Sequence, residues 1–523
     1  MRNHVWIAAL IAAVPTPGTA QAGPATPPPA LDANVARAMR EFGVPGLSIA
    51  IVKDGRVVLA KGYGVRRLGD PAPVDADTRF GIASNTKAFT ATALGLLVEE
   101  GKLEWDAPVV RYLPAFQMYD PWVTRQITVR DLLVHRSGLG LGAGDLLWWP
   151  PSTYDRPEIM RRLRFIEPAT SFRSAYAYDN VLYLVAGQLI EAVSGQSWED
   201  FVTDRILRPV GMREAVVLHS AAGQSGNVAA THARVDGKVQ VVAPFLSDNT
   251  NPAGGINAGA ADMARWLIAQ LDSGRVGTTR LWSERTQREL WSLVTPIPFG
   301  TPPPSLAPLA TNFNGYALGF NVREYRGEQL VTHTGGLPGY VSRVAMLPGR
   351  KLGVAVLTNA ESGAAFNAIA WYILDYYVGA KAFDWITPYA ALVARGDSMA
   401  SAEEAGAAAA RDSMSGPSLP LPRYAGTYTD AWYGDILVRE EGARLVMEFS
   451  HTPSLVGDMT HWQYDTFLVR WRDRELRADA LVTFSLDADG KIAQATMRAL
   501  SPATDFSFDF QDLLLRPVPT GGR

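Results

Sequence analysis

A serine and a lysine stand three residues apart at the start of an apolar segment, FGIASNTKAFTATALGLLVEEG, which covers residues 80–101. Residues three apart lie on the same face of a helix, so the Ser84 hydroxyl can reach the Lys87 amine. A serine needs a base to become a nucleophile, and a lysine serves only when burial or nearby positive charge lowers its pKa from about 10.4. The pair fits a nucleophile with its proton acceptor. The alternative is an N-capping serine beside a lysine whose ammonium reaches solvent.

Two further motifs follow in the chain. SAYAYDNVLYLVAG contains Tyr178 and Asn180 at Y-x-N spacing, and LVTHTGGLPGY contains an H-T-G motif that begins at His333. S-x-x-K, Y-x-N and H-T-G in this order resemble the serine β-lactamase and penicillin-binding protein superfamily. The Y-x-N and H-x-G forms look most like its class C-type branch, which includes class C β-lactamases, D-aminopeptidases, alkaline D-peptidases and β-lactamase-like esterases. The resemblance covers about residues 35–380.

The resemblance implies a role for each matching residue. Ser84 would be the acylated nucleophile. Lys87 would be its proton acceptor, or the group that keeps a phenolate stable. Tyr178 would be the general base or acid that carries the proton to the leaving group. Which of Lys87 and Tyr178 accepts the proton first stays open, because the two would titrate as a coupled set. The backbone N–H groups of Ser84 and Gly336 would form the oxyanion hole. The residues implied to support or bind the substrate are Asn180, His333, Thr334 and Gly335.

His333 departs from the penicillin-recognising enzymes, in which this motif begins with a lysine. A lysine would carry a charge that helps hold a substrate carboxylate, whereas a histidine with the ordinary pKa of about 6.5 is mostly neutral at about pH 7.5. We therefore expect a substrate that needs no carboxylate at this spot. We also expect hydrolysis of carboxylate-bearing substrates to gain efficiency as the pH falls towards about 6. Trp148 and Trp149 either wall an apolar acyl pocket or pack beneath their loop.

Composition disfavours several other kinds of chemistry. The chain has 523 residues, a net charge of −3, no cysteine and seven histidines. We expect no nucleic-acid partner, because no dense basic cluster is present. We expect no metal and no cofactor, since H-x-H, H-E-x-x-H and thiolate ligands are all missing from the sequence. A Ser-His-Asp hydrolase is disfavoured because no G-x-S-x-G nucleophile elbow occurs.

The apolar patterns predict an α+β fold. Alternating segments near residues 47–65 and 316–359 enclose a helical region, which suggests one antiparallel sheet assembled from both ends and flanked by helices. The resemblance implies that this is a β-lactamase/transpeptidase-like fold with an all-helical subdomain. Short alternating segments after residue 420 predict a small C-terminal antiparallel β-barrel, which looks lipocalin-like. We expect a hydrolase domain over residues 23–395, a linker over 396–420 and the barrel over 421–517.

Residues 1–22 have the pattern of a signal peptide. A charged Arg2 precedes an apolar run over residues 5–14, and Ala20-Gln21-Ala22 is a small-x-small cleavage site. The run is too short to span a bilayer, and no later run is long enough. We expect a secreted or periplasmic protein, cleaved near Ala22, without stable membrane insertion.

The expected function is that of a serine hydrolase working through an acyl-enzyme. Its partner would be a small peptide, ester or amide. An added lipocalin-like domain looks more like the peptidases of this group, including those that act on D-residue-containing or linearised peptides. The alternatives are a β-lactamase-like carboxylesterase, a β-lactamase, a D,D-carboxypeptidase, and a non-catalytic ligand sensor or assembly protein. The C-terminal domain would narrow the mouth of the cleft or form a homo-oligomer.

Overall fold

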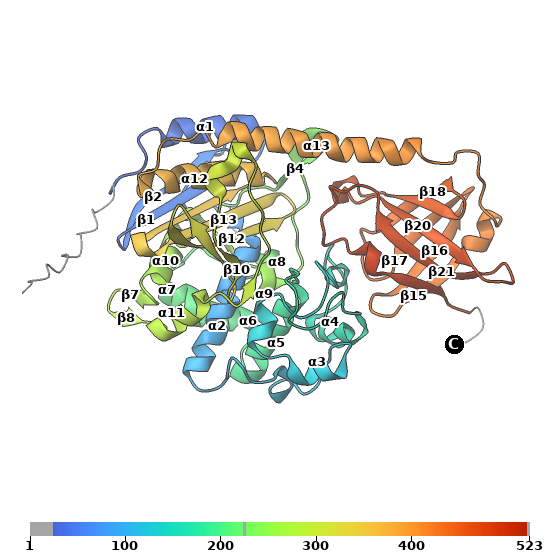
Figure 1. Cartoon of the computed structure of the whole chain (residues 1–523), viewed down its shortest axis with the longest axis horizontal. Coiled ribbons are helices and arrows are strands. Elements are labelled where there is room, and N and C mark those ends of the chain that lie inside the picture. The colour runs from blue at the N-terminus through green and yellow to red at the C-terminus, as the bar shows by residue number, and fades with distance from the viewer. Residues whose placement is uncertain (1–24, 223–225, 520–523) are drawn as a thin grey trace, which may run out of the picture.

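The protein consists of a sheet-and-helix body and a separate β-barrel, joined by one long helix (Figure 1). The structure is a computed structural model, and it describes residues 25–222 and 226–519. The predicted α+β fold with an all-helical region and a C-terminal antiparallel barrel is confirmed. The signal peptide that we predict at residues 1–22 lies outside the described residues.

The central sheet has eight antiparallel strands drawn from both ends of the first body. The N-terminal hairpin sits at one edge and pairs with the last strand of the body, as the sequence predicted. In spatial order the strands are β2 (Arg56–Gly64), β1 (Gly46–Lys53), β14 (Leu352–Thr358), β13 (Tyr340–Leu347), β12 (Glu328–Leu337), β11 (Asn321–Tyr325), β10 (Asn314–Tyr316) and β9 (Thr295–Pro296).

Both faces of the sheet are covered, which explains why its central strands are almost continuously apolar. In β1, Leu47, Ile49 and Ile51 point to one core, whereas Ala50 and Val52 point to the other. The first core is closed by α1 (Leu31–Phe42), α12 (Gly363–Val378) and the start of α13 (Ile386–Ala409). The second core faces α10 (Ala260–Leu271) and the helical region, so the site-bearing helices rest on a rigid support.

The helical region lies between the two halves of the sheet in sequence. Its apolar helix α2 packs against α5 and α11. The helices of this region are α2 (Lys87–Glu99), α3 (Pro121–Gln126), α4 (Arg156–Arg162), α5 (Val181–Ser194), α6 (Trp198–Val202), α7 (Arg208–Val210), α8 (His219–Ala222), α9 (Asn251–Gly254) and α11 (Glu284–Trp291). The two-stranded ribbons are β3 (Phe80–Gly81) with β6 (Asn257–Ala258), β4 (His232–Val235) with β5 (Lys238–Val241), and β7 (Arg275–Val276) with β8 (Thr279–Arg280).

Part of the expected linker is helical. Helix α13 continues to Ala409, so residues 396–409 of the segment predicted as a linker are helical. Alanine and glutamate are strong helix formers, and the Ala- and Glu-rich composition that suggested a linker extends the helix instead. Figure 1 shows α13 running from the sheet towards the barrel.

The C-terminal body is a closed, antiparallel barrel of eight consecutive strands. Gly442 and Gly490, both with positive φ, lie in the turns that join β16 to β17 and β20 to β21. Closure pairs the first strand with the last, so the barrel leaves no sheet edge exposed. The strands are β15 (Gly426–Asp430), β16 (Gly434–Glu441), β17 (Arg444–Phe449), β18 (Val456–Gln463), β19 (Thr466–Trp471), β20 (Ala480–Leu486), β21 (Ile492–Ala499) and β22 (Leu514–Pro517).

Hydrogen bonds and an ion pair fix the barrel against the first body. Arg477 forms two hydrogen bonds to the carboxylate of Glu361, at 2.6 and 2.9 Å. The Arg162 guanidinium donates to the carbonyl of Trp432 at 2.8 Å. Within the described residues, no helix combines the length and apolar character needed to cross a membrane.

The buried carboxylate of Asp375 connects α12 to β11 through hydrogen bonds, so we expect its removal to cause a large loss of stability. Asp375 accepts hydrogen bonds from Tyr325 at 2.6 Å, from Arg326 at 2.7 and 2.9 Å, and from Trp385 at 2.9 Å. We expect Asp375→Ala to lower the free energy of unfolding by about 3 kcal/mol, because it leaves a guanidinium and two other donors unpaired. Denaturant unfolding measures this change.

The matched control is Asp272→Ala, which removes an exposed ion pair with Arg275 at 3.7 Å. That substitution should cost less than about 1 kcal/mol. Equal losses in the two variants would contradict the structural role given to Asp375.

Candidate active site

Ser84 and Lys87 lie at the junction of a tight turn and α2. Ser84 belongs to a short 3₁₀ turn over Ala83–Thr86, and Lys87 is the first residue of the α-helix. No side chain caps this helix, so the capping alternative for Ser84 does not apply. Ala83 has a φ of +50°, a strained backbone conformation for a residue with a side chain. The turn therefore holds the serine at a sharply defined position.

The amine of Lys87 is fully buried and has three hydrogen-bond partners. Its Nζ lies 2.9 Å from the Ser84 Oγ, 2.7 Å from the Asn180 Oδ1 and 3.1 Å from the carbonyl oxygen of Ala253. Burial lowers the pKa of Lys87 to about 7, although the charges of Asp145 and Asp179 oppose the shift. A neutral amine is therefore accessible near neutral pH, as a lysine base requires.

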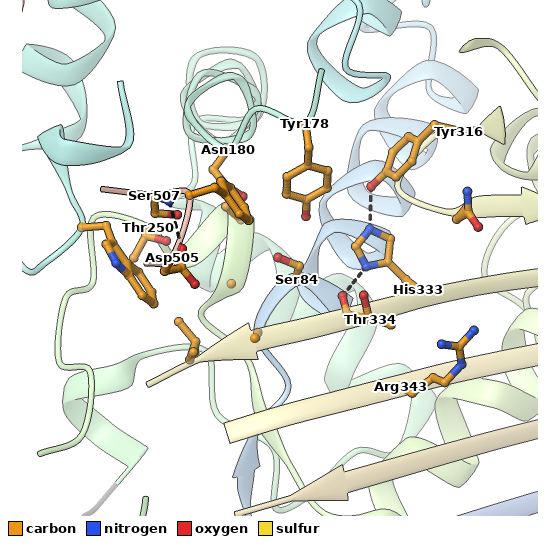
Figure 2. Close-up of a pocket in the computed structure, with 18 of the residues that line it drawn as sticks. Ser84, Tyr178, Asn180, Thr250, Tyr316, His333, Thr334, Arg343, Asp505 and Ser507 are labelled. Atoms are coloured by element: carbon orange, nitrogen blue, oxygen red, sulfur yellow. Dashed lines mark hydrogen bonds between the residues drawn. The ribbon is translucent and has the colours of Figure 1, made fainter. Parts of the chain in front are cut away.

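Tyr178 brings a side chain from a distant part of the sequence to the pair formed by Ser84 and Lys87. Figure 2 shows its hydroxyl facing that of Ser84, and both residues line the same cavity. The Lys87 Nζ lies 4.9 Å from the centre of the Tyr178 ring. Burial raises the pKa of Tyr178 well above its ordinary value, so the phenol keeps its proton in the free protein.

Asn180 connects Lys87 to a buried acid. Its Oδ1 accepts from Lys87, and its Nδ2 donates to the Asp145 Oδ2 at 2.8 Å. Asp145 is completely buried and also accepts from the indole of Trp148 at 3.0 Å. Burial raises the pKa of Asp145 to about 8.

His333 lies in the site, but its charge state differs from our expectation. Its Nδ1 lies 2.6 Å from the Thr334 carbonyl oxygen, so it carries the proton, and its Nε2 then accepts from the Tyr316 hydroxyl at 2.6 Å. Burial, with help from the charge of Lys87, lowers the pKa of His333 to about 3. The expected gain near pH 6 is therefore wrong in its cause, because His333 stays neutral there.

The two glycines after Thr334 have different surroundings. A Cβ on Gly335 would lie 2.2 Å from the carbonyl oxygen of Ile82, so only glycine lets β12 approach the nucleophile turn this closely. A Cβ on Gly336 would meet nothing within 4 Å, and Gly336 lines the same cavity as Ser84. The orientation of the Ser84 and Gly336 amides as an oxyanion hole remains a prediction.

The site opens into a cavity of about 490 Å³. Six of the eight predicted residues line it, while Lys87 lies beneath Ser84 and Gly335 packs against the turn. Both tryptophans of the predicted loop also line it, although each is mostly buried. The predicted residues on the cavity wall are Ser84, Tyr178, Asn180, His333, Thr334 and Gly336.

Three residues that support this site escaped the sequence analysis. The ring of His135 packs 4.2 Å from the ring of Tyr178, and its Nδ1 accepts from the Asp179 backbone N–H at 3.1 Å. Asp145 is an isolated acid in a glycine-rich loop, and Ser507 comes from the barrel. For His135 alone there was a signal in the sequence, because its segment ITVRDLLVHRSGLG (residues 127–140) also resembles the class C-type branch. Among residues 25–222 and 226–519, no group of three or more histidine or acidic side chains could hold a metal ion.

Comparison with known proteins assigns the first body. Residues 31–377 match the family described as Beta-lactamase. This chain belongs to the beta-lactamase family. It is a β-lactamase-fold serine hydrolase, as the resemblance predicted. Residues 410–517, which include the whole barrel, match a second family described as a domain of unknown function, DUF3471.

Individual relatives agree with this assignment. An unguisins hydrolase, ungD', from Aspergillus campestris is 30% identical over 431 residues, 77% of this chain and 76% of the relative. The octameric penicillin-binding protein homologue from Pyrococcus abyssi superposes with a TM-score of 0.57 at 22% identity, covering 93% of this chain and 98% of that one. A class C beta-lactamase from Rhodobacter sphaeroides has a TM-score of 0.54 at 22% identity, with 67% and 99% covered. The two structures show the shared fold.

The hydrogen bonds of His333 predict a fixed tautomer. We expect ¹⁵N NMR of histidine-labelled protein to show protonated Nδ1 and unprotonated Nε2 for His333 throughout the range from about pH 5 to 8, since burial keeps the ring neutral. The signals missing from a His333→Gln variant identify the ring. A titration with a midpoint near pH 6 would contradict the structure.

Proposed function

We propose that this hydrolase is a peptidase that acts on small or linearised peptides, including D-residue-containing ones, through an acyl-enzyme on Ser84. The observation that carries the proposal is the buried amine of Lys87 at 2.9 Å from the Ser84 hydroxyl, with a pKa near 7. The chain's own residues then supply the nucleophile, the base and the proton shuttle.

The partners of Lys87 direct its lone pair to the serine. The Asn180 Oδ1 and the Ala253 carbonyl oxygen can only accept hydrogen bonds. A neutral amine has two N–H groups, and these are used by the two acceptors. The lone pair is then left for the Ser84 hydroxyl, which donates its proton as the oxygen attacks the substrate carbonyl. We therefore assign Lys87 as the first proton acceptor and Tyr178 as the acid.

The remaining steps follow from this assignment. Ser84 Oγ bonds to the carbonyl carbon, and the resulting oxyanion is stabilised by the amides of Ser84 and Gly336. Tyr178 gives its proton to the leaving amine as the C–N bond breaks, and Lys87 returns the serine proton to Tyr178. In the second half, water loses a proton to the same pair of groups as its oxygen bonds to the acyl carbon. That proton passes to the Ser84 Oγ as its bond to the acyl carbon breaks, which releases the acid product.

Two features favour a peptide. Strand β12 pairs with β11 only up to Thr332, so its edge at residues 334–337 has no neighbouring strand within the described part of the chain. An extended peptide can pair with such an edge through its backbone. His333 is neutral and has both ring nitrogens engaged, so it does not supply a charge for a carboxylate. The name of the A. campestris relative, an unguisins hydrolase, agrees with hydrolysis but does not separate peptide from ester.

Location and assembly complete the proposal. The sequence of residues 1–22 supports export to the periplasm or the medium, with cleavage near Ala22. The octameric P. abyssi homologue supports a homo-oligomer. We retain a hydrolase domain over residues 23–395 and a barrel domain over 421–517.

A substrate panel tests the proposed chemistry. We expect D- and L-peptides to be cleaved with higher kcat/KM than p-nitrophenyl esters or nitrocefin, because an extended peptide can form backbone hydrogen bonds with the free edge of β12. A fluorophosphonate should add one phosphonyl group to Ser84, as measured by intact mass, and Ser84→Ala should remove both labelling and hydrolysis. Preferred cleavage of esters would support the carboxylesterase alternative, and of nitrocefin the β-lactamase. Activity retained in Ser84→Ala would refute the mechanism.

The pKa of Lys87 should determine how kcat/KM falls at low pH. Only neutral Lys87 can accept the serine proton, so kcat/KM should rise with pH to a plateau, with a midpoint near 7. Below that midpoint it should fall about tenfold per pH unit. Lys87→Arg, which stays charged, should lose more than about a thousandfold at every pH. A midpoint near 4 would point to a carboxylate base instead.

A further inference from the structure

The barrel contributes a loop to the active-site cavity. The connection between β21 and β22 places Asp505, Phe506 and Ser507 on the cavity wall, where Figure 2 shows the serine beside Asn180. The ring of Phe506 lies 6.2 Å from that of Tyr178. The two bodies therefore meet at the nucleophile's own pocket.

Two side chains anchor this loop to the turn that bears Asp145. The Ser507 hydroxyl donates to the Asp145 Oδ2 at 2.8 Å, and Ser507 is only 4% exposed. The carboxylate of Asp509 accepts from the backbone N–H groups of Gly144 at 2.6 Å and Leu146 at 3.1 Å. Asp145 and Asp509 are both fully buried, so these bonds form away from solvent.

Asp145 in turn decides which way the amide of Asn180 points. A primary amide has a donor end and an acceptor end, and its neighbours set the orientation. The Asp145 Oδ2 accepts from Nδ2, which leaves Oδ1 for Lys87. In the flipped amide, the NH₂ group would face the amine and compete with Ser84 for its lone pair.

We propose that Ser507 and Asp145 are positioning residues for the reaction: the serine of the barrel orients the Asp145 carboxyl, which fixes the Asn180 amide for Lys87. A chain of hydrogen bonds then runs from the second body to the nucleophile, and the docked barrel is part of the working site. This inference rests on the proposed function.

The same chain makes a prediction about pH. Burial raises the pKa of Asp145 to about 8, so its carboxyl carries no charge over the acidic limb, whose midpoint lies near 7. Removing either group should therefore slow the reaction without moving that midpoint. The other titratable groups that face Lys87 and Asp145 are unchanged in these variants; they are Asp179, Asp509, His135, His333, Tyr178 and Tyr183.

The test measures acylation in the full-length protein. Ser507→Ala and Asp145→Asn should slow the burst of a p-nitrophenyl ester about tenfold, equivalent to losing one hydrogen bond of about 1.4 kcal/mol. KM should change less than about twofold, because neither group is assigned to hold substrate. Both variants should leave the midpoint of the acidic limb in place. Ser507→Thr, which keeps the hydroxyl, should restore the rate. Ser501→Ala, in the same loop, is the matched control.

The outcomes separate the two proposals. Normal acylation in Ser507→Ala and Asp145→Asn, with Ser84→Ala inactive, would overturn the positioning role and leave the mechanism standing. A rise in KM alone would also overturn it, since that would make Ser507 a substrate contact. Hydrolysis that survives in Ser84→Ala would remove the proposed function itself. If Ser507→Ala does not fold, Asp145→Asn and Ser507→Thr decide the question by the same measurements.

Discussion

The arrangement of the site depends on keeping one amine out of water. Burying the side chain of Lys87 costs free energy unless its hydrogen atoms find acceptors, and the three partners come from three separate segments. One is on the strained turn before α2, one precedes α5, and one is in α9. The amine can therefore be buried only when the helical region is correctly packed on the sheet. Folding and the creation of a usable base are the same event here, because loosening any of these segments would readmit water and restore an ordinary lysine.

Much of this could be predicted from the sequence because the information is local. Short-range patterns include the alternation of the strands, the Asp54-Gly55 turn and the apolar spacing of α12. Each of the three catalytic motifs is also only a few residues long. The order of the motifs predicted which residues meet around the cavity, because the family that the chain resembles has a fold that brings these motifs together. The composition of residues 396–420 suggested a linker but did not predict its conformation, because a flexible segment and an exposed alanine-rich helix use the same residues.

The parts that could not be predicted depend on distant neighbours. Asp145 and Ser507 are 362 residues apart, and nothing in either segment indicates that they share a hydrogen bond. The charge state of His333 was misjudged for a related reason. A reference pKa describes a solvated ring, whereas this ring is mostly buried against Tyr178 and Tyr316, where its cation is poorly stabilised. Burial is a property of the packed structure, and a motif does not report it.

The neutral ring of His333 and the unpaired edge of β12 determine how the cavity can select its substrates. With both nitrogens of His333 engaged inside the protein, recognition passes to the backbone of β12 and to the walls of the cavity. Those walls include two tryptophans from the first body and Phe506 from the barrel. A backbone edge accepts many extended chains with similar affinity, so selectivity between them must come from the walls. Since one wall belongs to the barrel, related hydrolases that keep the same catalytic motifs can differ in substrate simply through the loop that their second domain inserts.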